Sequence, residues 1–171
     1  MNLHTFIRDI PDFPKPGIIF KDITPLLLNP KAVLYCLDKL VEPLQELAID
    51  KVIGIESRGF IFGNLIAQRL QSGFVPVRKP GKLPGQTISA KYTLEYGTNE
   101  LQLHTDAIMK GDRVLIHDDL LATGGTARAA ADLVHQLGGQ VIRSSFIIQL
   151  AFLEGNKKLP NIPVSSVLVY D

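Results

Sequence analysis

The chain has 171 residues, of which 46% are apolar and 20% charged, and its formal net charge is +1. This length favours a single domain over residues 1–171 that is large enough to bury a hydrophobic core. The balanced charge argues against a broad basic face for nucleic acid, and no stretch approaches the roughly 20 apolar residues of a membrane-spanning helix.

The N-terminal part of the chain contains one predicted helix. Met1 to Ile10 carries charges and lacks the continuous apolar run of a signal peptide, so we expect a cytoplasmic protein. Apolar residues from Val33 to Leu47 follow helical spacing, with a distortion expected at Pro43. The single cysteine, Cys36, lies among them, which excludes an intrachain disulfide and indicates a core thiol.

Strand and helix patterns then alternate along the chain. The predicted strands cover residues 51–56, 74–78, 113–117, 140–150 and 164–169, and the predicted helices cover 58–71 and 126–137. Pro76 weakens the second strand prediction, because proline cannot donate to a sheet ladder. The alternation predicts an α/β fold, a mainly parallel twisted sheet flanked by helices, with the ligand site along the edge where the strands end.

Residues 80–105 interrupt this alternation. Glycines and prolines punctuate the segment, and Thr87–Leu94 and Glu100–His104 alternate like the two strands of a hairpin. Because such an excursion from a compact domain is usually functional or disordered, we expect a flexible β-hairpin flap.

The most informative stretch runs from Val114 to Thr126, where an apolar strand leads through two aspartates into a Thr-Gly-Gly-Thr turn. Gly124 and Gly125 permit positive φ and a close approach of the backbone to a ligand, and Thr126 is expected to cap the next helix. Free N–H groups at a helix N-terminus favour a phosphate. A Gly-Gly turn is common by itself, so the phosphate prediction depends on the whole combination.

Asp118 and Asp119 need a separate explanation, because two carboxylates beside a phosphate site repel it. We place Asp118 at the start of the loop and interpret the pair as acceptors for the hydroxyls of a ribose, with Mg²⁺ carried by a pyrophosphate to lower the repulsion. Solvated aspartates at a strand end are the plainer alternative. The sequence has neither the pattern of a P-loop nor the G-x-G-x-x-G pattern of a dinucleotide site.

Five segments, in order, resemble the adenine-specific branch of the type I phosphoribosyltransferases. They are residues 11–25 (PDFPKPGIIFKDITP), 56–60 (ESRGF), 78–85 (RKPGKLPG), 94–97 (LEYG) and 118–126 (DDLLATGGT). The resemblance spans about residues 9–150 and implies the family's fold with a small N-terminal hood. It also implies the reaction of adenine with phosphoribosyl pyrophosphate to give AMP and pyrophosphate, with Mg²⁺ as cofactor, and a homodimer with the N-terminal part near the partner.

The resemblance implies a role for each motif residue. The 5′-phosphate would be held by Ala122, Thr123, Gly124, Gly125 and Thr126, and the ribose by Asp118 and Asp119. The pyrophosphate would meet Arg58, Arg78, Lys79 and Lys82. Adenine would contact Ile19, Phe20 and Arg58, with its edge read by backbone groups.

The flap would supply the catalytic groups. Glu95 would handle the adenine proton, with Glu100 as the alternative, and Tyr96 would pack over the closed site. For Glu95 a solvated hairpin carboxylate is the plainer interpretation, as a core ring is for Phe20 and a surface cation for Arg58.

A second function class is a non-catalytic regulatory module of the same fold that senses phosphoribosyl pyrophosphate or a nucleotide. Such a module is expected to carry a nucleic-acid-binding segment or a broad basic face. The sequence shows neither, and its flap keeps a carboxylate and an aromatic residue, so an enzyme is the favoured prediction.

Overall fold

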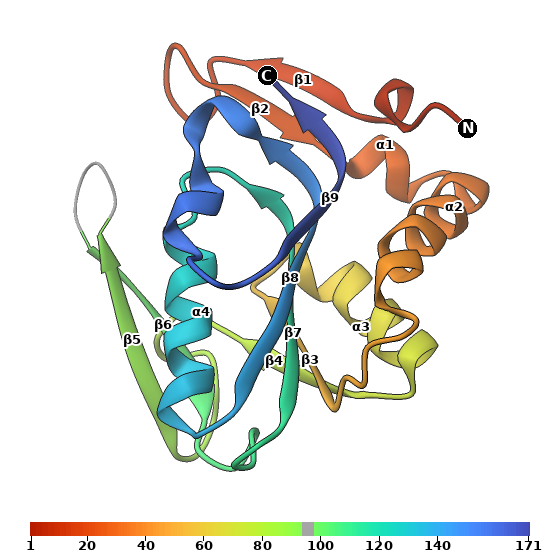
Figure 1. Ribbon diagram of the computed structural model, residues 1–171. Helices are drawn as coiled ribbons and strands as arrows, with labels where there is room; N and C mark the ends of the chain where they lie inside the picture. The colour runs from red at the N-terminus through yellow and green to blue at the C-terminus, as the bar shows by residue number, and fades with distance from the viewer. Residues whose placement is uncertain (94–97) are drawn as a thin grey trace.

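The computed structural model describes residues 1–93 and 98–171, and its centre is a five-stranded sheet in the order β4-β3-β7-β8-β9 (Figure 1). The strands are β3 (Lys51–Ile55), β4 (Gly73–Val77), β7 (Arg113–Leu121), β8 (Gln140–Leu150) and β9 (Val164–Tyr170). Every neighbouring pair is parallel. The α/β prediction is therefore confirmed, and Pro76 lies in β4, an edge strand that tolerates a proline.

Helices cover both faces of this sheet (Figure 1). One face carries α2 (Pro30–Val41) and α3 (Gly59–Leu70), and the other carries α4 (Gly125–Gln136). Pro43 lies in a short 3-10 helix, η2 (Glu42–Leu44), directly after α2, so the predicted distortion is confirmed. Within the described residues, no helix has the length and apolar character needed to cross a bilayer.

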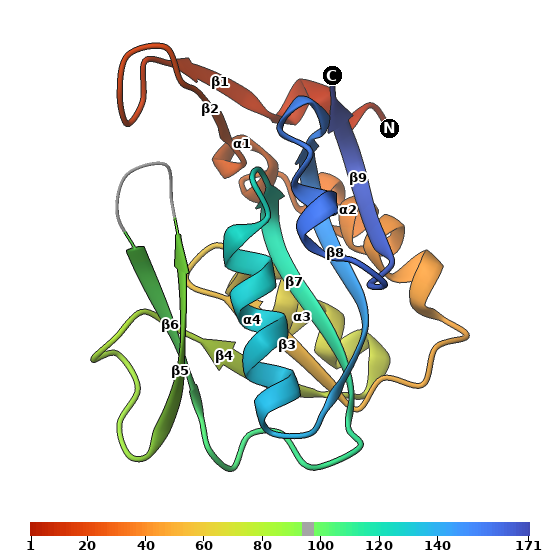
Figure 2. The same ribbon diagram turned by 60° about the vertical axis from the view of Figure 1, so that its left-hand side comes forward.

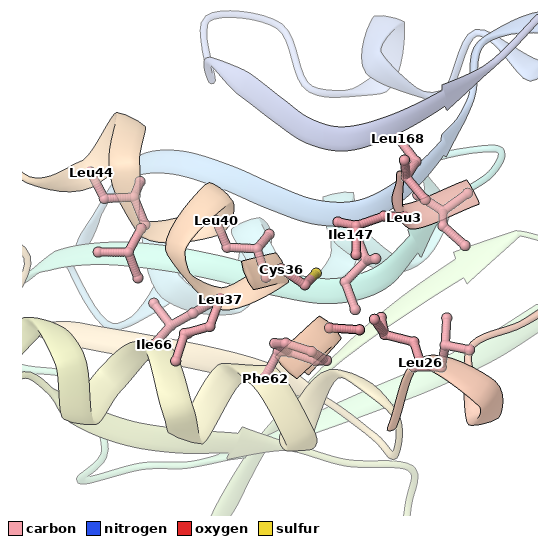
Figure 3. Close-up of a cluster of buried hydrophobic side chains, with 14 of the residues drawn as sticks. Leu3, Leu26, Cys36, Leu37, Leu40, Leu44, Phe62, Ile66, Ile147 and Leu168 are labelled. Atoms are coloured by element: carbon pink, nitrogen blue, oxygen red, sulfur yellow. The ribbon is translucent and has the colours of Figure 1, made fainter. Parts of the chain in front are cut away.

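The larger buried cluster lies between the sheet, α2 and α3 (Figure 3). Cys36 is fully buried in it, beside the leucines of α2 that Figure 3 labels. This burial raises the pKa of the Cys36 thiol to about 12, because the thiolate would lose its hydration. The thiol therefore stays protonated at neutral pH, which confirms the interpretation of Cys36 as a core residue.

The opposite face of the sheet buries a second cluster that includes part of the predicted flap. The hairpin consists of β5 (Thr87–Thr93) and β6 (Thr98–His104). Its residues Ala90, Leu101 and Leu103 are buried in the same cluster as three alanines of α4, Ala129, Ala130 and Ala131. The hairpin prediction is confirmed for the described residues, and the hairpin is attached to the core by its apolar face.

A small hood precedes the sheet in the chain and lies at the carboxyl ends of its strands (Figure 2). It comprises η1 (Leu3–Phe6), β1 (Arg8–Pro11), β2 (Ile19–Asp22) and α1 (Thr24–Leu27). Lys21 connects the hood to the last strand, because its Nζ lies 2.8 Å from Asp9 Oδ1 and 4.1 Å from the centre of the Tyr170 ring. The hood is thus fixed over the edge where a parallel sheet binds ligands.

Candidate active site

The two aspartates lie at the carboxyl end of β7, the central strand of the sheet. The expectation that Asp118 begins a loop is wrong, because β7 continues to Leu121 and stays paired with β8 over that stretch. The Asp119 N–H donates to Asp118 Oδ1 over 2.9 Å. Both carboxylates are therefore held on a rigid strand rather than on a loop.

Gly59, the first residue of α3, leaves the space that Asp118 occupies. A Cβ at Gly59 would lie 2.9 Å from Asp118 Oδ1 and 2.9 Å from the carbonyl oxygen of His117. Since real Cβ atoms essentially never approach so closely, a side chain here would displace the acidic strand end. This contact explains why a glycine follows Arg58 in the sequence.

Arg58 lies in the turn between β3 and α3 and faces the acidic pair. Its Nε is 2.8 Å from Asp119 Oδ2, and only 4% of the Asp119 side chain is exposed. Its guanidinium carbon also lies 4.6 Å from the centre of the Phe20 ring, a cation–π contact. One cation thus touches both the carboxylate and the aromatic ring that the sequence singled out.

The acidic pair carries more negative charge than Arg58 offsets. Burial, and then the neighbouring charge of Asp119, raise the pKa of Asp118 well above its ordinary value. Burial also raises the pKa of Asp119, although the Arg58 guanidinium opposes this. Groups that donate hydrogen bonds, or a cation brought by a ligand, would stabilise the ionised pair.

The turn of residues 122–126 follows β7 directly and leads into α4. Gly124 has φ +77° and precedes the helix as its N-cap, with no side-chain hydrogen bond at the cap. The predicted positive φ is confirmed at Gly124, whereas Gly125 is already the first helical residue. The expectation that Thr126 caps α4 is wrong, because the left-handed Gly124 starts the helix before Thr126 is reached.

A cavity of about 200 Å³ joins the acidic pair to this turn. Its walls are Arg58, Asp118, Asp119, Leu120, Leu121, Ala122, Thr123, Gly124, Thr126, Ala127 and Phe146. It is lined mostly by polar surface and includes the N-terminus of α4, where N–H groups and the helix dipole favour an anion. The predicted ribose and phosphate residues, Gly125 excepted, therefore meet around one space.

A second, mainly apolar cavity of about 360 Å³ lies beneath the hood. Its walls are Lys15, Ile18, Ile19, Phe20, Lys21, Arg58, Leu120, Ala122, Thr123, Leu150 and Leu153. Arg58, Leu120, Ala122 and Thr123 line both cavities, so the two are neighbours with a common wall. All three residues predicted to contact adenine, Ile19, Phe20 and Arg58, line the apolar one.

The predicted pyrophosphate cations after β4 line neither cavity. Arg78 donates to Glu56 from Nε and Nη2 over 3.2 and 3.1 Å, and to the Lys82 carbonyl from Nη1 over 3.0 Å. Lys79 donates its backbone N–H to Glu56 over 2.9 Å. Burial would raise the pKa of Glu56, but the Lys79 N–H and the Arg78 guanidinium lower it below its ordinary value, so it stays ionised.

Some functional candidates were not found from the sequence, and others lie outside the described residues. Leu120, Leu150 and Leu153 supply apolar wall to the second cavity, and the sequence marks them only as apolar residues at or after a strand end. Glu95 and Tyr96 fall within residues 94–97, which the structure does not describe. Glu100 lies in β6, opposite Lys91 of β5.

Comparison with known proteins agrees with this geometry. A family model described as a phosphoribosyl transferase domain matches residues 34–162. A protein of Flavobacterium johnsoniae named adenine phosphoribosyltransferase is 58% identical over 170 residues, which cover 99% of this chain and 100% of the relative.

Solved structures extend the likeness to three dimensions. The adenine phosphoribosyltransferase of Rhodothermus marinus has a TM-score of 0.95 and 55% identity, over 98% of this chain and 96% of that one. The adenine phosphoribosyltransferase of Saccharomyces cerevisiae, solved with adenine and an imino-altritol bisphosphate, has a TM-score of 0.91 and 43% identity, over 97% of this chain and 96% of that one. The chain therefore belongs to the phosphoribosyltransferase family and, within it, to the adenine phosphoribosyltransferases.

Proposed function

We infer that this protein transfers the 5-phosphoribosyl group of phosphoribosyl pyrophosphate to adenine, giving AMP and pyrophosphate. One observation carries the inference, the common wall of two different cavities. The polar cavity contains the acidic pair and a helix N-terminus, and the apolar cavity is lined by the aromatic ring of Phe20. A sugar phosphate fits the first cavity and a flat base fits the second. The full-length likeness to adenine phosphoribosyltransferases supports the same assignment.

The polar cavity would align the sugar. Backbone N–H groups of the 122–126 turn and the hydroxyls of Thr123 and Thr126 would hold the 5′-phosphate at the start of α4. Asp118 and Asp119 would accept hydrogen bonds from the ribose hydroxyls. Since both groups belong to one strand–turn–helix unit, the ribose C1 would be aimed along the wall shared with the apolar cavity, where N9 of the base arrives.

The leaving pyrophosphate needs positive charge. Among the described cations, Arg58 lines both cavities, whereas Lys15 and Lys21 line the apolar cavity alone. Lys79 and Lys82 are exposed and belong to the segment that Glu56 and Arg78 hold. We assign them, with Arg78, to the pyrophosphate as it departs.

Mg²⁺ is the cofactor we propose, carried by the pyrophosphate. Among the described residues there is no group of three or more side chains able to hold a metal ion, and the Asp118–Asp119 pair is opposed at contact distance by Arg58. These residues fit a cation that enters with the substrate, with the acidic pair as its neighbouring protein charge. When bound, Mg²⁺ would offset the charge of the leaving group.

The apolar cavity would select and orient the base. The Phe20 ring offers a face for stacking, and Leu120 and Leu150 contribute apolar wall. Phe20 itself packs edge-on against Phe13, with 5.1 Å between the two ring centres. Backbone groups near Ile19 and Arg58 would read the edge of adenine. Glu95 would take the proton that adenine loses, and Tyr96 would shield the reaction from water.

We further propose a homodimer in the cytoplasm. The exposed large apolar side chains of the N-terminal half include Leu28 at 84%, Leu34 at 56% and Ile61 at 40%, which a second copy would cover. The lone buried thiol suits a reducing compartment. Sedimentation would test the dimer, and a Leu34→Glu variant should shift it toward the monomer.

A panel of bases tests the activity. The enzyme is incubated with phosphoribosyl pyrophosphate, Mg²⁺ and adenine, hypoxanthine or guanine, and nucleotide is measured. Adenine should react and the 6-oxo purines should be largely refused, because acceptors for the 6-amino group would be left unpaired. Efficient use of guanine would overturn the adenine assignment. Tight binding of the substrate without product from any base would favour the regulatory module instead.

A further inference from the structure

The short segment between β8 and β9 touches the 122–126 turn through backbone atoms. It includes η4 (Gly155–Lys158), which lies beside the start of α4 (Figure 2). Gly155 is buried, whereas Glu154 and Asn156 on either side of it are exposed. The buried position of one small residue in an exposed stretch indicates a contact that depends on that residue.

The contact is made between two glycines. A Cβ at Gly155 would overlap the carbonyl oxygen of Ala122 and would lie 2.9 Å from the backbone nitrogen of Gly124. A Cβ at Gly124 would in turn overlap the carbonyl oxygen of Gly155. Both obstacles are backbone atoms, which cannot rotate away as the end of a flexible side chain can. The two backbones therefore approach as closely as they do because neither position carries a side chain.

Side-chain packing beside the turn also holds the segment in place. Leu159 is only 2% exposed and packs in a buried cluster with Leu121, Ala127 and Phe146. Glu154 has φ +51°, and its carbonyl accepts a hydrogen bond from the Lys157 N–H over 3.0 Å. Because this packing limits how far the segment can move away, a side chain added at position 155 would displace the backbone of the turn.

We propose that Gly155 is a positioning residue for phosphoribosyl binding, which acts by setting the backbone of the 122–126 turn. The inference rests on the proposed assignment of the 5′-phosphate to that turn. Ala122 and Gly124 are the two turn residues against the segment, and a phosphate is held there by backbone N–H groups whose directions follow from the backbone. A shift of a few tenths of an ångström at Gly124 would turn these donors away from the phosphate.

The test separates ligands with and without the 5′-phosphate. Gly155→Ala should weaken AMP binding, measured by calorimetry, by about tenfold or more, since hydrogen bonds to charged groups are being misdirected. Its adenine affinity should fall by a smaller factor than its AMP affinity, because Ala122 and Thr123 are the only residues of the turn that line the apolar cavity. In steady-state kinetics, KM for phosphoribosyl pyrophosphate should rise by a larger factor than KM for adenine.

Gly139→Ala is the matched control. Gly139 is also buried and crowded, with a Cβ there 2.7 Å from Ile108 Cγ2 and 2.8 Å from Val134 Cγ1, but it follows the other end of α4. This variant should have a lower thermal stability, but its AMP affinity should not fall relative to its adenine affinity. If Gly155→Ala weakens both ligands equally, or neither, the positioning role is overturned.

A second variant guards against a Gly155→Ala protein that does not fold. Leu159→Val loosens the packing of the same segment without adding an atom beside the turn. It should weaken the binding of AMP more than the binding of adenine. Equal weakening would again overturn the proposal. Failure of the wild-type protein to make AMP would instead refute the proposed function, so the two failures are distinguishable.

Discussion

The Nε of Arg58 lies 2.8 Å from Asp119 Oδ2, so a residue of the wall that the two cavities share is paired with a carboxylate of the polar cavity. Asp119→Asn should remove a charged acceptor for the ribose and release Arg58 from its partner. Hydrogen bonds to charged groups contribute about 1.5–3 kcal/mol, so kcat/KM for phosphoribosyl pyrophosphate should fall roughly ten- to a hundredfold.

Asp132→Asn is the control for Asp119→Asn. It breaks the exposed Arg128–Asp132 ion pair within α4, 2.8 Å long, which touches neither cavity. Its kinetics should match the wild type. Wild-type kinetics for Asp119→Asn itself would show that the ribose assignment is wrong.

Phe20 should contribute to adenine binding through its ring face. Phe20→Leu keeps an apolar side chain but loses stacking and the cation–π contact with Arg58. Aromatic pairs are worth about 0.5–1.5 kcal/mol beyond their buried area, so KM for adenine should rise roughly two- to tenfold. Phe13→Leu should have a smaller effect, because Phe13 supports Phe20 edge-on and does not line the apolar cavity. The reverse order would contradict this assignment.

Glu56 and Arg78 should behave as one unit. Their carboxylate and guanidinium are joined by two hydrogen bonds, so removing either partner releases the segment that carries Lys79 and Lys82. In a double-mutant cycle on kcat/KM for phosphoribosyl pyrophosphate, Glu56→Ala with Arg78→Ala should be little worse than the more damaging single variant. Additive effects would mean that Arg78 binds the pyrophosphate independently of Glu56.

The proton assignment remains a prediction, because Glu95 lies outside the described residues. General acid–base help is typically worth about 10²–10⁴ in rate, so Glu95→Gln should lower kcat strongly and leave KM for phosphoribosyl pyrophosphate nearly unchanged. Glu100→Gln, in β6, should do much less. If Glu100→Gln lowered kcat more than Glu95→Gln did, the catalytic role would belong to Glu100. Full activity in both variants would mean that solvent or the departing pyrophosphate accepts the proton.

His117 should make the fold sensitive to acid. It is fully buried in β7, and the loss of hydration lowers its pKa from 6.5 to about 3. Above pH 6.5 the folded and unfolded chains are both neutral at this residue, so it has no effect on the pH dependence there. As the pH falls from about 6.5 toward 3, only the unfolded chain gains the proton, and stability falls by up to about 1.4 kcal/mol per pH unit.

Urea unfolding at pH 7.5 and pH 5 would measure this effect in the wild type and in His117→Leu. The wild type should lose more stability between the two pH values than the variant does, since the other titrating groups are common to both proteins. Equal losses would show that the His117 ring is already protonated or is hydrated in the folded state.

The sequence predicted the sheet well because each strand is a short apolar run between helices of clear periodicity. It failed at the end of β7, where Asp118 and Asp119 have the composition of a loop but stay in the strand, since β8 is long enough to pair with them. Local composition cannot report the length of a neighbouring strand. The helix cap at Thr126 failed for a related reason, because only the backbone angle of Gly124 decides where α4 begins.

The parts of the candidate site that are rich in charged residues and glycines could be predicted from the sequence. The parts that depend on backbone and apolar contacts could not. Arg58, the acidic pair and the 122–126 turn stand out in the sequence and meet around one cavity. In the sequence, Leu150 and Leu153 resemble any other apolar residues, and Gly155 resembles a glycine of a surface loop. Such residues are recognised only once distant segments have been brought together.

The wall common to the two cavities limits how this enzyme could be given a new base. A substitution at Leu120, Ala122 or Thr123 would disturb the sugar phosphate as well as the base, because these residues face both. Ile18 and Leu153 border the apolar cavity alone and come from the hood and from the segment after β8. Redesign of base preference should therefore begin at these two positions, where the pocket can be reshaped while the phosphoribosyl half is left intact.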